Sequence, residues 1–167
     1  MRFDRNIPFL TSKPSEKKLR KLGFNNIEVL KNGTQKNIGD LTIKAHDAGF
    51  PYNYLWTFSF EIIQGEKVLY FESHVDKPSR IKQNDLKADC AILTTEEVKI
   101  LGLLPLSNSS ETTLEILKEL ECKNIMIQGS DPAETKGLIS YFLKIGKENL
   151  GVFKSNNINV YKDPGSE

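Results

Sequence analysis

The residues best suited to chemistry lie where two predicted strands end. The sequence contains two histidines, His46 and His74, and each has a carboxylate nearby in the chain. Asp47 directly follows His46, while Glu72 and Asp76 flank His74. Zinc and related divalent ions bind neutral imidazole and carboxylate groups, commonly three or four to a site. These five residues suggest a metal or acid/base site spanning two loops, although a histidine at a strand end also serves as a surface or hydrogen-bonding residue.

Nucleophilic catalysis is less favoured by the sequence. Ser73 stands beside His74, but the chain has neither a G-x-S-x-G turn nor a G-x-x-x-x-G-K-[ST] phosphate loop. Cys90 falls within an apolar run, where a cysteine is more often a core residue than a catalyst. The mildly basic segment 77–82 is interpreted as a solvated face.

The stretch 67–76 is an apolar, β-favouring run that ends in the polar residues just named. Functional side chains often lie just beyond strand ends, because the sheet fixes their position while the loop leaves them accessible. Residues 54–63 alternate with a period of two, and the turn at 64–66 leads into the run 68–71, which predicts a hairpin. Further strands are predicted at residues 7–10, 27–30, 41–45, 88–94, 124–128 and 158–161.

Helices are predicted where apolar residues recur every three or four positions. Residues 16–22 follow capping residues and end at Gly23, and residues 111–120 follow Ser110 as the cap. A third helix is predicted at 134–147, whereas 95–108 is predicted to be a less regular loop. Strands come in pairs first and then alternate with helices, so the predicted fold class is α/β, with a mixed β-sheet and flanking helices.

Length and composition limit the number of domains and the kinds of partner that are expected. The 167 residues fit a single domain, 1–167, that can bury a core without a disulfide or a metal. A net charge of +1 gives no reason to expect nucleic acid or a membrane as partner, so a small molecule or another protein is the expected ligand. Cys90 and Cys122 are expected to be reduced thiols. With no apolar leader or membrane span in the sequence, a cytoplasmic protein is expected.

The order of these segments resembles the C-terminal two-thirds of the metallo-β-lactamase-fold superfamily. Residues 70–74, Tyr-Phe-Glu-Ser-His, are similar to the Tyr-Tyr-Glu-Pro-His signature of an uncharacterised cyanobacterial and plant branch. The resemblance implies a partial αββα sandwich, truncated at its N-terminal side. The other segments that carry it are 4–12, 19–24, 39–43, 88–93, 137–139 and 163–167.

The resemblance also implies a degenerate site. Before Ile7 nothing supplies the H-x-H-x-D-H motif of the superfamily's enzymes, and residues 128–130 replace their final metal histidine. We therefore expect a non-catalytic binding or interaction module that needs no cofactor. The alternative is a metal-dependent hydrolase of a small ester, lactone or phosphodiester, with one zinc or other divalent metal in a reduced or partner-completed site. A missing first sheet would expose an apolar face, which predicts a homodimer or a partner chain that covers it.

Overall fold

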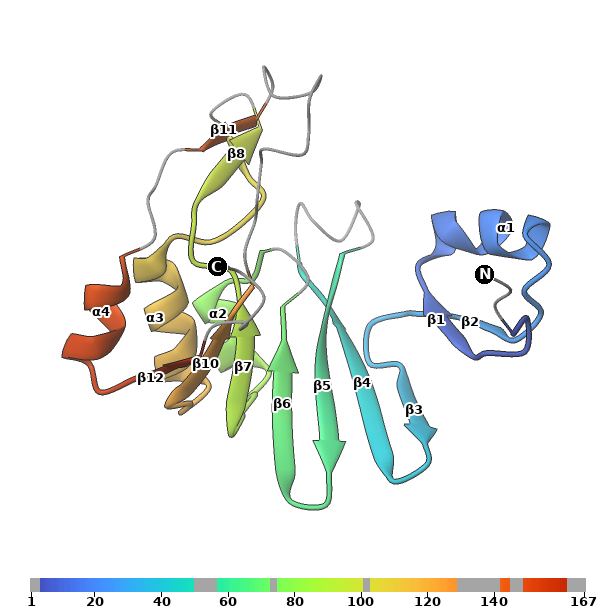
Figure 1. Ribbon diagram of the computed structural model, residues 1–167, viewed down its shortest axis with the longest axis horizontal. Helices are drawn as coiled ribbons and strands as arrows, with labels where there is room; N and C mark the ends of the chain where they lie inside the picture. Colours follow the sequence, from blue (N-terminus) through green and yellow to red (C-terminus); the bar gives the residue numbers. More distant parts are fainter. Residues whose placement is uncertain are drawn as a thin grey trace.

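The computed structural model describes residues 4–49, 57–72, 75–100, 103–128, 142–144 and 149–161. At its centre is a seven-stranded sheet, in which β3 to β6 pair antiparallel while β6, β7, β10 and β12 pair parallel (Figure 1). The predicted α/β class with a mixed sheet is therefore confirmed. Across the sheet the strands are β12 (Asn159–Tyr161), β10 (Asn124–Ile127), β7 (Cys90–Leu93), β6 (Lys67–Phe71), β5 (Phe58–Gln64), β4 (Leu41–Asp47) and β3 (Gln35–Ile38).

The predicted hairpin lies in the middle of this sheet. β5 and β6 pair from Phe60 opposite Phe71 to Gln64 opposite Lys67. Gly65 turns the chain with φ of +58°, a left-handed conformation that glycine adopts without a steric penalty. The strand β3, which was not predicted, pairs antiparallel with β4 at the edge of the sheet.

Three helices pack on one face of the sheet and form the main core. They are α2 (Pro78–Gln83), α3 (Ser110–Glu119) and α4 (Leu150–Ser155). Their inward side chains, such as Ile81, Leu117 and Phe153, are fully buried in one cluster with Tyr70 and Ile125 of the sheet. The helix predicted at 111–120 corresponds to α3, whereas α2 and α4 were not predicted.

The cap of α3 differs from the prediction by one residue. The hydroxyl of Ser109 accepts a hydrogen bond from the Thr112 backbone N–H at 3.2 Å, so Ser109 is the N-cap. Ser110 is buried and its hydroxyl donates to the Thr95 carbonyl at 2.9 Å. Ser110 therefore ties the start of the helix to the loop after β7.

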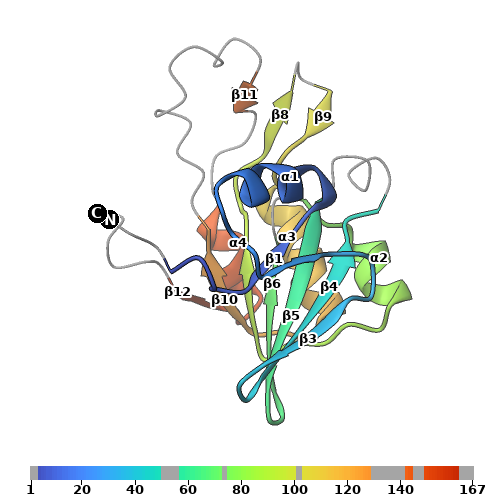
Figure 2. The ribbon, with the colours of Figure 1, turned by 90° about the vertical axis from the view of Figure 1, so that its right-hand side faces the viewer.

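A smaller unit stands beside the β3 edge of the sheet. It comprises β1 (Phe9–Thr11), α1 (Lys13–Lys21) and β2 (Ile27–Val29), with β1 and β2 paired parallel (Figure 2). Leu30, directly after β2, packs with Ala45 of β4 and Phe58 of β5. The unit thus covers the β4–β5 end of the sheet face opposite the helices.

Two predictions were wrong in the region that forms a three-stranded sheet, β11-β8-β9. β8 (Val98–Ile100) and β9 (Leu104–Pro105) form a hairpin in the segment predicted to be a loop. β11 (Phe142–Lys144) pairs with β8 and lies within the segment predicted to be a helix; the rest of 134–147 lies outside the described residues. Pairing with β8 therefore overrode the helical periodicity at these residues. No helix in the described part of the chain has the length and apolar character to span a membrane.

Candidate functional site

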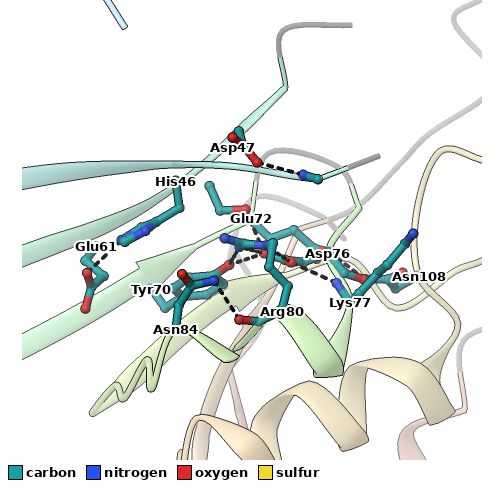
Figure 3. A network of polar contacts seen from close by, with 12 residues as sticks. His46, Asp47, Glu61, Tyr70, Glu72, Asp76, Lys77, Arg80, Asn84 and Asn108 are labelled. Atoms are coloured by element: carbon teal, nitrogen blue, oxygen red, sulfur yellow. Dashed lines mark hydrogen bonds and ion pairs between the residues drawn. The ribbon is translucent and has the colours of Figure 1, made fainter. Parts of the chain in front are cut away.

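Three side chains converge on Asp76 beneath the sheet (Figure 3). Ser59 donates a hydrogen bond to Oδ2 of Asp76 at 2.8 Å, and the Tyr70 hydroxyl donates to the same oxygen. Arg80 donates from Nε to Oδ1 at 2.6 Å and from Nη2 to Oδ2. The backbone N–H of Lys77 donates to Oδ1 at 2.8 Å. Both carboxylate oxygens are therefore engaged within the protein.

This Asp76 network is buried and carries its own counter-charge. The Asp76 side chain is 0% exposed and that of Arg80 is 11% exposed. Burial raises the pKa of Tyr70 well above its ordinary value, and the negative charge of Asp76 raises it further. Tyr70 therefore remains a neutral donor, and the ion pair fixes the start of α2 against β6.

Glu72 lies just after β6 in a second buried network. Asn108 donates from Nδ2 to Oε1 at 2.6 Å, and Oε2 accepts from the Thr94 backbone N–H at 3.2 Å and the Thr94 hydroxyl at 3.3 Å. Its side chain is fully buried. Burial raises the pKa of Glu72 to about 8, and the nearby charge of Asp76 contributes in the same direction. Glu72 therefore holds the segment before α3 against the end of β6.

His46 pairs with a residue that the sequence did not single out. Its Nε2 lies 2.8 Å from Oε2 of Glu61 on the neighbouring strand, and the two side chains are 15% and 11% exposed. The hydrogen bond from His46 lowers the pKa of Glu61. His46 lies opposite Ser59 in the strand register, so this pair occupies the same sheet face as the Asp76 network.

The other two candidate residues do not join these groups. Oδ1 of Asp47 accepts a hydrogen bond from the Gly49 backbone N–H at 3.0 Å, which closes a local turn. His74 lies outside the described residues. The proposed role of His74 therefore stays a prediction.

The described residues do not fit a divalent metal. Glu72 and Asp76 use both of their carboxylate oxygens in buried hydrogen bonds, and His46 is committed to Glu61 through Nε2. No group of three or more His, Cys, Asp or Glu side chains placed to hold a metal occurs among the described residues. Among the described residues, Glu72 and Asp76 could ligate zinc only by giving up these hydrogen bonds.

A different surface is formed by the sheet face opposite the helices. Residues opposite one another in neighbouring strands share a face, and the strand registers define two rows that cross six strands. The first row is apolar throughout, and the second is apolar in four strands and ends in two asparagines. We call these two rows the open sheet face. The first row is Ala45, Phe60, Phe71, Ile92, Met126 and Tyr161, and the second is Ile43, Ile62, Leu69, Cys90, Asn124 and Asn159.

The open sheet face is partly exposed along most of its length. Met126 is 42% exposed and Tyr161 is 51% exposed, while Phe71 and Ile92 are half-buried. Phe60 and Phe71 place their ring centroids 6.3 Å apart. By contrast, Tyr70 on the helix-covered face is fully buried. An apolar surface of this extent is typical of an interaction site.

Several members of the buried networks were missed at the level of sequence. Ser59 and Glu61 stand on the polar side of an alternating strand, a pattern usually read as solvent-facing. Arg80 lies four residues after Asp76, a spacing typical of helical ion pairs, so this contact had a signal in the sequence. Asn108 is 36 residues from Glu72, and nothing in the sequence links them.

Comparison with known proteins identifies the fold. No family model matches the sequence, and no curated protein matches it either. Solved structures do match. The chain is similar to an isothiocyanate hydrolase from Delia radicum gut bacteria, with a TM-score of 0.68 at 19% identity, covering 98% of this chain and 67% of that one.

Two further solved structures match in the same way. One is a possible metal-dependent hydrolase from Veillonella parvula, with a TM-score of 0.67 at 13% identity, covering 99% of this chain and 67% of that one. The other is the metallo-β-lactamase fold protein YhfI from Bacillus subtilis, with a TM-score of 0.64 at 11% identity, covering 98% and 65%. The chain also matches CmlA, a diiron β-hydroxylase from Streptomyces venezuelae, but spans 34% of its length.

Proposed function

We propose that this chain, which has the metallo-β-lactamase fold, is a non-catalytic binding module whose open sheet face binds a second copy of the same chain. The observation that carries the proposal is the apolar row across six strands, together with a second row that is apolar from β4 to β7. Leaving apolar surface in water is unfavourable by about 25 cal/mol per Å². A partner that covers these rows therefore gains stability from nearly every strand of the sheet.

A second copy suits this surface because the rows contain no charged side chain, and Lys36 of β3, which lies opposite Ile43 at the end of the second row, is paired with Glu28 at 2.7 Å. A symmetric dimer presents the same patch on both chains, so any charge near the two-fold axis would face its own copy. Lys67 lies on the same sheet face, two residues beyond Leu69, where it would border the interface. The apolar rows can meet without opposing like charges.

The state of the candidate ligands supports a role without catalysis. Glu72 and Asp76 hold the protein together through buried hydrogen bonds. A catalytic zinc site needs three protein ligands and an open position for water, and the carboxylates of Glu72 and Asp76 have neither free oxygens nor solvent access.

The experiment is light scattering on the purified chain at about 20 μM, which is well above the Kd of a dimer of about 1 μM affinity. The wild-type protein is expected at twice the chain mass of 18.9 kDa. Met126→Glu, at a position already 42% exposed in the single chain, is expected to yield monomer, because each copy then brings a carboxylate into an apolar interface. Leu103→Glu is the control, since Leu103 is 83% exposed and lies away from the rows.

Two results would contradict the proposal. A wild-type monomer at this concentration would exclude a second copy as the occupant of the open sheet face. A dimer that survives Met126→Glu but separates on Leu103→Glu would locate the interface elsewhere. Circular dichroism of each variant verifies that the fold is retained.

The alternative function is a metal-dependent hydrolase whose site is completed by a partner chain. It is favoured by the solved structures of similar fold that are named hydrolases. Metal analysis of protein purified without chelator, repeated on His74→Ala, separates the two functions. A stoichiometric transition metal that is lost in His74→Ala would support the hydrolase, and a metal-free wild type would exclude it.

A further inference from the structure

The helix α1 concentrates positive charge in a chain that is nearly neutral. Its nine residues, Lys13–Lys21, contain five cationic side chains and one carboxylate, a net charge of +4. Since the whole chain carries +1, the remaining residues together carry −3. The whole-chain charge therefore hides a strongly basic segment.

Four of the five cations of α1 share one side of the helix. Lys13, Lys17 and Lys21 follow one another at intervals of four residues, which places them in one row, and Arg20 lies beside Lys17. All four are exposed, whereas Leu19 is half-buried. The row spans about 13 Å of helix.

One acidic residue of the helix neutralises part of this charge. Glu16 pairs with Lys13 at 3.1 Å and with Arg20 at 3.0 Å. For Lys17, Lys18 and Lys21, the described part of the chain offers no acidic partner within ion-pair distance. Three exposed ammonium groups are thus available to an external anion.

The position of α1 leaves this surface accessible. In the view of Figure 1 the helix lies above the β1–β2 pair, at the opposite end of the molecule from α4. The view from that end shows α1 in front, above β1 and β2 (Figure 2). None of its residues is buried.

We propose that the exposed lysines of α1 bind the phosphate backbone of double-stranded nucleic acid without sequence preference. A duplex carries one phosphate charge per ~1.7 Å of its axis, so the three available lysines, which span about 6 Å of helix, face about three or four phosphates. Contacts from Lys to phosphate position a protein on a duplex without reading its sequence.

The surroundings of the row favour a duplex over the other polyanions. A helix that lies in a lipid interface needs a broad apolar face, and the apolar residues of this segment are Leu19, half-buried, and Leu22, 56% exposed. Single-stranded nucleic acid is bound by exposed aromatic rings that stack on bases. Phe9 and Phe24 instead contact each other, with ring centroids 4.6 Å apart.

The test measures binding of a fluorescein-labelled 20-bp mixed-sequence DNA duplex by anisotropy at 50 and 200 mM salt. If three lysines contact phosphates, wild-type affinity falls about 40-fold between these salt concentrations. The variant carrying Lys17→Glu, Lys18→Glu and Lys21→Glu is expected to bind at least 10-fold more weakly at 50 mM salt. The control variant carries Lys82→Glu, Lys123→Glu and Lys154→Glu, three exposed lysines outside this unit, and keeps most of the affinity and its salt dependence.

Each outcome decides the proposal. Loss of binding confined to the α1 variant, with retained thermal unfolding, supports it. Equal loss in both variants would mean that total charge alone governs binding and would overturn it. No duplex binding by the wild type at 50 mM salt, or binding to phosphatidylserine vesicles in place of the duplex, would also overturn it.

Discussion

Replacing Arg80 by methionine removes the cation that neutralises a buried carboxylate. The guanidinium donates to both oxygens of Asp76 and, at 2.7 Å, to the Tyr70 hydroxyl. Methionine retains much of the length and apolar stem of arginine but supplies no donor or charge. Asp76, which is fully buried, would then keep hydrogen bonds from Ser59, Tyr70 and the Lys77 backbone but no ion-pair partner.

The expected cost follows from this burial. Removing one partner of a buried ion pair destabilises a protein by about 3–5 kcal/mol, because the other charge remains desolvated. With Asp76→Asn in the background, no carboxylate is stranded, so Arg80→Met should cost about 2 kcal/mol less there. The two residues are therefore expected to show strong coupling in a double-mutant cycle.

The assay is urea unfolding at pH 7 of the wild type, both single variants and the double variant. Lys82→Met on the same helix is the matched control, and it should change the free energy of unfolding by less than about 0.5 kcal/mol because Lys82 is exposed. If Arg80→Met costs under about 1 kcal/mol, or the single-variant effects add within about 0.5 kcal/mol, the buried network does not stabilise α2 as inferred.

Two further predictions concern single side chains. Because the pKa of Glu72 is raised to about 8, the folded state keeps a proton that the unfolded state loses above about pH 4.5. The free energy of unfolding should therefore decline as the pH rises from about 4.5 to about 8, by up to roughly 5 kcal/mol from this group. Glu72→Gln should flatten that decline in urea unfolding measured from pH 5 to 8. Identical pH profiles for the wild type and the variant would exclude the raised pKa. Ser109→Ala should cost about 1 kcal/mol because it removes the cap of α3. Ser12→Ala should cost less, since the Ser12 side chain makes no cap hydrogen bond, and equal thermal shifts for the two variants would contradict this assignment.

The helices and strands that were predicted correctly are those whose conformation follows from residues within the element itself. The hairpin of β5 and β6 follows from alternation and Gly65, and α3 follows from a leucine stripe with a serine before it. The missed helix α2 has six residues and begins at Pro78, so it is too short to show a period. β11 was missed because its conformation depends on pairing with β8, a contact distant in sequence.

The candidate site was predictable in its residue types but not in its partners. Sequence showed that Glu72 and Asp76 stand at the end of a strand, where metal ligands often occur. It could not show that Asn108 and Thr94 would close around Glu72, since these contacts span 36 and 22 residues. A carboxylate available to a metal and one saturated by internal donors look identical in sequence, because the difference depends on residues that meet only in the folded chain.

The alternation of β5 supports a partner on the open sheet face for a further reason. An alternating strand normally turns its apolar residues to the core and its polar residues to water. In β5 the polar residues Ser59 and Glu61 are buried, at 0% and 9% exposed, as is Phe58 at 7%, whereas Phe60 and Ile62 are half-buried. The polar residues can be buried because Asp76 and His46 satisfy them. On the opposite side, Leu30 and its neighbours cover Phe58 and part of Phe60, whereas Met126 and Tyr161 farther along the same face are 42% and 51% exposed. The Met126→Glu experiment tests whether a second copy covers that part of the face.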